Sequence, residues 1–169
     1  MAQKPDLRPT PDRVRETLFN WLGQWLDGLA CLDLFAGSGA LGFEAASRGA
    51  TRVVMVENDA AACKELDKFR ALVGANAVEV VRGDALEYLA RSRERFDVVF
   101  LDPPFRQNLL PAIFRLLKGS KGLRVYVESS EPFAPDGAWQ ELKRSRAGQV
   151  SYQLFEWRSD DQGGLPGNV

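Results

Sequence analysis

The chain has 169 residues, with 22 Lys and Arg against 23 Asp and Glu and a formal net charge of −1. This length fits one domain with a sizeable core, and the balanced charge means that any contact with nucleic acid has to come from a local basic patch. Histidine is absent, and Cys31 and Cys63 cannot form a zinc site by themselves, so no metal is expected. The absence of a signal peptide and of a long apolar run predicts a cytoplasmic protein outside the membrane.

A helix is predicted near the amino terminus, over about residues 11–27. Thr10 is a suitable N-cap, and the proline after it fits the first helical position because its missing N–H has no partner there. Apolar residues then recur at helical spacing and form a stripe that can dock on a sheet: Val14, Leu18, Trp21, Leu22, Trp25 and Leu26. Arg8, Arg13 and Arg15 gather at the start of this helix. They are either a solvated helix end or contacts to a phosphate or a cofactor carboxylate.

A strand over residues 30–35 is followed by a glycine-rich turn and a helix over residues 40–48. The turn reads Gly37-Ser38-Gly39-Ala40-Leu41-Gly42, and glycines there let the backbone and the helix amino terminus approach a ligand. The G-x-G-x-x-G spacing alone suggests NAD as readily as another nucleotide cofactor. Asp33 favours a different cofactor, because an acid at this position repels a pyrophosphate but attracts an ammonium or a sulfonium group.

Two further strands also lead to acids. The strand over residues 52–56 ends at Glu57, which is placed to accept both hydroxyls of an adenosine ribose; NAD and S-adenosylmethionine share this feature. The strand over residues 77–82 leads to Asp84. This side chain can cap the next helix, accept from an adenine amino group, or do both.

The most informative stretch runs from Phe96 to Phe105. A short run rich in Val and Phe and ended by two prolines predicts a strand buried on both faces, with Asp102 at its carboxyl end, where open parallel sheets bind ligands. Pro103 and Pro104 fix the backbone, so their carbonyls can point at a ligand. Phe105 adds a flat apolar surface.

These groups can bind a planar base that carries an exocyclic amino group. The acid and the fixed carbonyl can accept its two N–H bonds, and the aromatic ring can stack on the base. Acceptors outside the ring plane help to localise the amino lone pair, which can then attack an electrophilic methyl group. Orientation and preorganised electrostatics would supply most of the rate. The alternative is that Asp-Pro-Pro only ends a strand with a capping acid.

The rest of the chain completes an alternating α/β pattern within a single domain, residues 1–158. The remaining predicted elements are helices over 59–73 and 108–117, a strand over 123–128, and a hairpin of strands 139–146 and 149–157. Lys143, Arg144 and Arg146 on this hairpin form a row of basic side chains that could contact the phosphates of a nucleic acid. The tail, residues 159–169, is predicted to be disordered.

Taken together, these motifs resemble the bacterial 16S rRNA guanine-N2 methyltransferase family. The resemblance covers nearly the whole chain and rests on Arg8-Pro9-Thr10 with residues 12–16, on Leu32 to Gly42, and on Asp102 to Phe105. It implies the Rossmann-like fold of class I methyltransferases, with a mostly parallel seven-stranded sheet, helices on both faces and a carboxyl-terminal antiparallel hairpin. S-adenosyl-L-methionine is the implied cofactor.

The resemblance also assigns roles to residues. The implied cofactor site consists of Thr10, Asp33, Phe35, Ala36, Gly37, Ser38, Gly39, Glu57, Asn58, Asp84 and Ala85. The implied catalytic group is Asp102, Pro103, Pro104 and Phe105, and the implied RNA contacts are Arg8, Arg13 and Arg106.

Family members usually carry a basic strand hairpin before Arg-Pro-Thr, whereas this sequence begins only a few residues ahead of it. Either the chain is shortened or RNA docking uses other surfaces.

The expected function is methylation of guanine N2 in 16S rRNA, either free or in the small subunit, by a monomeric enzyme that flips or captures an exposed base. Methylation of adenine N6 in DNA is the second hypothesis, because Asp-Pro-Pro suits that amine equally well. A non-catalytic RNA-binding or assembly module is the third. An NAD oxidoreductase is weaker, because no histidine is present for hydride chemistry.

Overall fold

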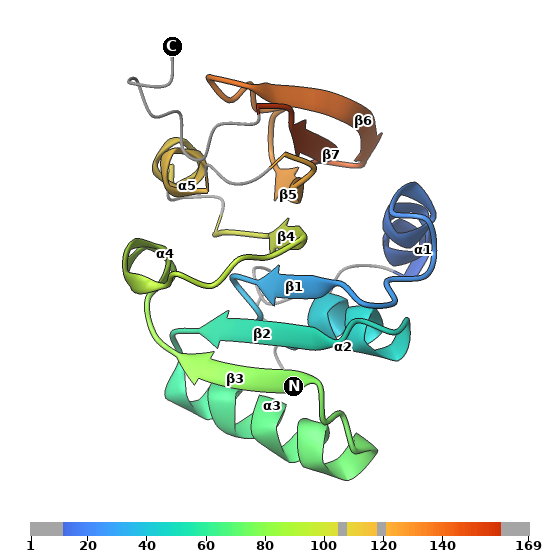
Figure 1. The fold of residues 1–169 in the computed structure, drawn as a ribbon, viewed down its shortest axis with the longest axis vertical. Helices are drawn as coiled ribbons and strands as arrows, with labels where there is room; N and C mark the ends of the chain where they lie inside the picture. The colour runs from blue at the N-terminus through green and yellow to red at the C-terminus, as the bar shows by residue number, and fades with distance from the viewer. Residues whose placement is uncertain (1–11, 105–107, 118–120, 160–169) are drawn as a thin grey trace.

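The computed structural model describes residues 12–104, 108–117 and 121–159, and Figure 1 shows their arrangement. The chain alternates strands and helices and then ends in two strands. The elements are α1 (Asp12–Trp21), β1 (Ala30–Asp33), α2 (Ala40–Ser47), β2 (Arg52–Glu57), α3 (Ala60–Val73), β3 (Val78–Arg82), α4 (Ala85–Arg91), β4 (Val98–Leu101), α5 (Leu110–Leu116), β5 (Arg124–Ser129), β6 (Trp139–Ala147) and β7 (Val150–Trp157).

The strands form one seven-stranded sheet in the order β3-β2-β1-β4-β5-β7-β6. Strands β1 to β5 are parallel, while β7 lies antiparallel between β5 and β6. The order reverses at β1. Strands β2 and β3 are added on one side of β1, and the chain then crosses back so that β4 pairs with the other side of β1. In open α/β sheets, the ligand crevice lies at the carboxyl ends of the strands at such a switch point.

Helices cover both faces of the sheet (Figure 1). One core cluster joins α1, α2 and α3 to one face, and a second joins α4 and α5 to the other. In β4 all four residues are buried and alternate between the two clusters, as expected for a strand covered on both faces. The predicted mostly parallel sheet with a carboxyl-terminal hairpin is confirmed.

Side-chain caps begin two of the helices. Asp59 accepts a hydrogen bond from the Ala62 N–H at 2.8 Å and starts α3. Asp84 accepts from the Glu87 N–H at 3.0 Å and starts α4. Each acid satisfies one of the amide donors that have no partner within the first helical turn. The capping role that the sequence left open for Asp84 is therefore confirmed.

The predicted extent of the first helix, residues 11–27, is wrong at its carboxyl end. Helix α1 ends at Trp21, because Gly23 and Gln24 both adopt positive φ, at 97° and 72°. The following segment is bound to the end of α2, with the Leu26 N–H donating to the Arg48 carbonyl at 2.9 Å. Leu26 is buried as the apolar stripe predicted, but Trp25 is 68% exposed, so the stripe is wrong for Trp25 as well as for the break in the backbone.

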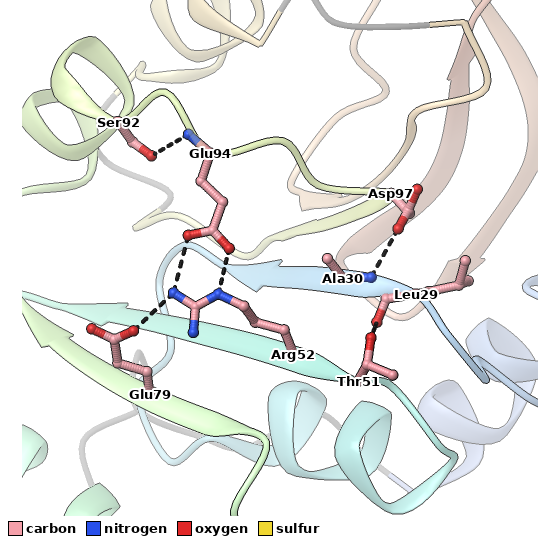
Figure 2. Close-up of polar contacts among 8 residues, drawn as sticks. All are labelled: Leu29, Ala30, Thr51, Arg52, Glu79, Ser92, Glu94 and Asp97. Carbon is pink, nitrogen blue, oxygen red and sulfur yellow. Dashed lines mark hydrogen bonds and ion pairs between the residues drawn. The ribbon is translucent and has the colours of Figure 1, made fainter.

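Polar contacts tie the strands together at their amino ends, the sheet edge opposite the crevice (Figure 2). The Arg52 guanidinium on β2 binds Glu79 of β3 at 2.8 Å and also forms an ion pair with Glu94, in the segment before β4. The Asp97 carboxylate accepts from the Ala30 N–H of β1 at 2.8 Å. These contacts join β1, β2, β3 and the segment before β4 at the strand ends away from the glycine turn.

Within the ranges given above, no helix is both long enough and apolar enough to cross a bilayer.

Replacing Gly39 with alanine should destabilise the protein by about 3 kcal/mol, because a Cβ adds left-handed strain and overpacking. Gly39 has φ +81°, and its Cβ would lie 2.7 Å from both Leu66 Cδ2 and Phe43 Cε2. Gly74→Ala is the matched control: its φ is +68°, with nothing within 4 Å of the added carbon, so a loss of only about 1 kcal/mol is expected. Urea unfolding measures both values, and equal losses would contradict the close approach at Gly39.

Candidate active site

The candidate site lies at the switch point, where β1 and β4 run side by side. Asp33 is the last residue of β1 and Asp102 directly follows β4. The parallel register pairs Asp33 with Phe100, so both acids lie at the same edge of the sheet. The fold therefore brings together two acids that are far apart in the sequence.

Asp33 is only 3% exposed and is held by the start of α2. Its Oδ2 atom accepts a hydrogen bond from the Gly42 N–H at 3.0 Å, which satisfies a donor of the first helical turn. The pKa of Asp33 is raised to about 7, mainly by burial; the Gly42 bond lowers this pKa, and the charges of Glu57 and Glu128 contribute to the rise. A cation placed beside this group would favour its ionised form.

The glycine turn connects β1 to α2 and leaves its backbone accessible. Gly37 has φ +55°, and nothing lies within 4 Å of the position that a Cβ would occupy. Ser38 beside it is exposed. The turn is held in place because the Gly37 N–H donates to Glu57 Oε1 at 2.8 Å. Phe35 and Ala36 lead into this turn, and the Ala36 N–H bonds the Val56 carbonyl at 3.0 Å.

Glu57 connects the tips of three strands. Its Oε1 holds Gly37, after β1, and its Oε2 accepts from the Asp59 N–H at 3.0 Å. Its backbone carbonyl accepts from the Gly83 N–H at 3.0 Å, next to Asp84. The structure therefore gathers Glu57, the glycine turn and Asp84 into one region, as the sequence predicted for a nucleoside site. Asn58 and Asp84 are exposed there, and Ala85 is buried.

Asp102 is half-buried and pairs with Glu128, which is buried. Its carboxyl group is hydrogen-bonded to that of Glu128 on β5, and burial, followed by the charges of Glu128 and Asp33, raises its pKa well above the usual value. The Tyr126 hydroxyl donates to Glu128 Oε2 at 3.0 Å. A hydrogen bond between two carboxyl groups requires a proton, so Asp102 and Glu128 share one. Pro103 is buried next to this pair and Pro104 is exposed.

Sequence reasoning missed Glu128, although a signal was present. Glu128 follows the apolar run Val125–Val127, just as Asp33, Glu57 and Asp102 follow theirs. It is 5% exposed, so it is not a solvated strand end. An acid at the tip of each buried parallel strand is the pattern that would have identified it.

Several predicted site residues cannot be compared with the structure. Arg8, Thr10, Phe105 and Arg106 lie outside the described residues, as does the predicted tail from residue 160. Arg13 is described and is exposed on α1, near Tyr152, whose pKa its charge lowers. Among the described residues, no group of three or more Cys, Asp or Glu side chains is arranged to hold a metal ion.

A family model described as "Conserved hypothetical protein 95" matches residues 1–156. The chain belongs to this family. A relative named ribosomal RNA small subunit methyltransferase D, from Escherichia coli strain K12, is 43% identical over 164 residues, which cover 92% of this chain and 82% of the relative.

Solved structures agree with this family assignment. A candidate methyltransferase from Escherichia coli, yhhF, has 41% identity and a TM-score of 0.84, with 93% of this chain and 91% of that chain covered. An RNA methyltransferase from Salinibacter ruber, solved in complex with S-adenosyl-L-homocysteine, has a TM-score of 0.68 over 92% of this chain and 99% of that chain. At 24% identity the second likeness shows the fold alone. The predicted family resemblance and the Rossmann-like methyltransferase fold are both confirmed.

Asp33 should make the free energy of unfolding fall as the pH rises from about 4 to about 7. Its pKa is raised from 3.8 to about 7, so the folded protein retains a proton that the unfolded chain releases in this interval. The slope for one proton is about 1.4 kcal/mol per pH unit. Asp33→Asn keeps an oxygen for Gly42 but cannot titrate, so its urea-unfolding free energy should depend less steeply on pH.

The exposed Asp136→Asn variant is the control for this measurement and should follow the wild-type pH profile. If Asp33→Asn and the wild-type protein show the same slope, Asp33 is not the buried titrating group.

Proposed function

We propose that this chain uses S-adenosyl-L-methionine to methylate the exocyclic N2 amine of a guanine in 16S rRNA of the small ribosomal subunit. One observation carries the proposal: Asp102 lies at the tip of β4, near Asp33 at the tip of β1, the strand that leads into the glycine turn. The substrate is rRNA, free or assembled into the subunit, and the enzyme acts as a monomer in the cytoplasm. The names of its relatives support an rRNA substrate.

The residues at the switch point fit the cofactor chemically. The open backbone at Gly37 leaves room for close approach, and Glu57 offers carboxylate lone pairs at the position of a ribose. The exposed Asp84 side chain can accept from an adenine amino group, and the buried Asp33 provides a negative charge beside the turn. When bound, the cofactor supplies an electrophilic methyl group on a positively charged sulfur.

Asp102 orients the target amine. An ionised oxygen of the Asp102–Glu128 pair accepts one N–H of the amino group, and the carbonyl of Pro103 accepts the other. With both N–H bonds held, the amino lone pair would be directed toward the methyl group that the cofactor would supply when bound. Such preorganised acceptors contribute most in a site from which water is excluded.

Glu128 provides a place for the released proton. The new N–C bond leaves a positive charge on nitrogen, which is removed when one N–H proton passes to Asp102. The pair holds one proton between two carboxyl groups and so has room for a second. Tyr126 keeps Glu128 oriented through its 3.0 Å hydrogen bond.

Adenine N6 in DNA is the alternative substrate, because it presents a similar amine to the same acceptors. The rRNA substrate named for the relatives favours guanine in rRNA over it. A non-catalytic RNA-binding module would have no need for an acid pair near an open glycine turn. The same pair argues against an NAD oxidoreductase, because it offers proton acceptors at an amine and no partner for hydride transfer.

The function is tested with methyl-labelled cofactor and three substrates: naked 16S rRNA, small subunits from cells that lack the modification, and duplex DNA. Label is expected in one of the RNA substrates, and digestion should give N2-methylguanosine as the only labelled nucleoside. Label appearing in N6-methyladenosine from DNA would support the alternative, and the absence of cofactor binding by calorimetry would leave only a binding module.

Asp102→Ala should slow methyl transfer about a hundredfold or more, by analogy with the loss of one preorganised polar contact, while cofactor affinity stays near wild type. Glu57→Ala should do the reverse and weaken cofactor binding first. Calorimetry with the cofactor and single-turnover methylation measure the two effects separately. Full activity of Asp102→Ala would show that the acid has no part in the reaction.

A further inference from the structure

A cavity of about 280 Å³ lies between α1 and the hairpin strands, next to the site described above. Helix α1 contributes Arg13, Thr17 and Trp21 to its lining, and the strands contribute Tyr126, Tyr152 and Ser145. Nothing in the proposed transfer of a methyl group to an amine uses this space. Its walls combine aromatic, aliphatic and polar side chains, and two arginines, Arg13 and Arg146, line it.

The cavity continues a row of side chains that begins at the acid pair. The strand register pairs Glu128 on β5 with Tyr152 on β7, and Tyr152 with Ser145 on β6. Directly paired residues of antiparallel strands point to the same face of a sheet. The row Asp102, Glu128, Tyr152 and Ser145 therefore runs from the catalytic acid into the cavity, and the acids Glu128 and Asp102 both raise the pKa of Tyr152.

The two cavity tyrosines differ in their hydrogen bonding. Their rings are stacked with centroids 6.4 Å apart, but only the Tyr126 hydroxyl is used, in its bond to Glu128. Tyr152 is 5% exposed, and among the described residues its hydroxyl has no hydrogen-bond partner. Burial, followed by the charges of Glu128 and Asp102, raises its pKa to about 12, so the hydroxyl keeps its proton at neutral pH. The ring of Tyr152 is buried, but its hydroxyl is accessible from the cavity and is free to donate to an acceptor there.

Arg13 supplies a positive charge beside the cavity, which is the sign that a phosphate group requires. It is exposed on α1, and its guanidinium acts electrostatically on Tyr152 across the cavity. Within the described part of the chain, this guanidinium forms no ion pair. Trp21 is half-buried two turns further along the same helix and presents an indole to the cavity. An arginine, a phenol donor and an indole match a phosphate joined to a flat base.

We propose that this cavity binds the nucleotide adjacent to the target guanine in the RNA strand. Its phosphate lies at Arg13 and the Tyr152 hydroxyl, and its base packs against Trp21. The proposal rests on the proposed function, because the occupant has to be continuous with a base held at Asp102. Because it binds a neighbouring nucleotide, the enzyme should prefer a guanine in an unpaired or splayed RNA strand to a free guanine nucleoside.

The test uses short single-stranded RNAs with one guanine, either complete or abasic at the nucleotide 5′ or 3′ to it. For the wild-type protein, one abasic position should weaken binding about tenfold, as expected for the loss of one stacked base. Trp21→Leu should bind the complete and the abasic RNA equally. Trp25→Leu is the matched control, because Trp25 is 68% exposed and lies outside the cavity, and it should discriminate as the wild type does.

Tyr152→Phe provides an independent variant that keeps the buried ring and removes only the hydroxyl. Its KM for rRNA should rise about tenfold, because an O–H donor to a phosphate is lost, while kcat and cofactor affinity stay near wild type. Thermal unfolding at the wild-type temperature confirms that the ring packing is intact. Arg115→Ala, an exposed arginine of α5 on the opposite face of the sheet, should leave KM unchanged.

The two proposals can fail separately. If the wild type methylates guanine but Trp21→Leu retains the preference for the complete RNA and Tyr152→Phe retains its KM, the cavity does not bind the neighbouring nucleotide. If the wild type discriminates against the abasic RNA through Trp21 but methylates no guanine, the cavity proposal holds and the proposed reaction is wrong.

Discussion

The reversal of strand order between β1 and β4 is the constraint on which the rest of the structure depends. It separates the crossover helices at the carboxyl ends of β1 and β4, since α2 and α3 lie on one face and α4 and α5 on the other, and open α/β sheets bind ligands at such a switch point. The glycine turn, Glu57 and Asp102 all follow strands that end at this edge. The ion pairs of Arg52 with Glu79 and Glu94 join the strands at their opposite, amino-terminal ends. The connections at the carboxyl ends are therefore not needed for these contacts and can contact ligands.

A cluster of acids then determines the electrostatics at the carboxyl ends of these strands. The carboxylates of Glu128 and Asp33 raise the pKa of Asp102, Glu128 also raises the pKa of Asp33, and loss of contact with water raises both pKa values most. A cluster of this kind is unfavourable when empty, and a ligand that carries positive charge and N–H donors relieves it. The same physical argument accounts for an ammonium and sulfonium cofactor and for an amine substrate, so both parts of the proposed reaction use one feature of the fold.

Much of the fold could be predicted from local patterns in the sequence. Buried strands gave clear apolar runs, and Asp59 and Asp84 were recognisable as helix caps because capping depends only on residues within one turn. The end of α1 was misplaced, because the apolar stripe continues beyond Trp21 while the backbone turns at Gly23 and Gln24. Burial alone does not distinguish a longer helix from a turn that packs its side chains on the same core.

The sequence by itself determined the alternating α/β pattern, the glycine turn and the acids at the ends of three strands, since these depend on residue type and short-range spacing. Only the tertiary structure decided that Asp102 shares a proton with Glu128 and that Tyr152 continues the same row toward Arg13. Those contacts join β4, β5, β7 and α1. Their register is set by packing of the whole sheet, which no local stretch of sequence encodes.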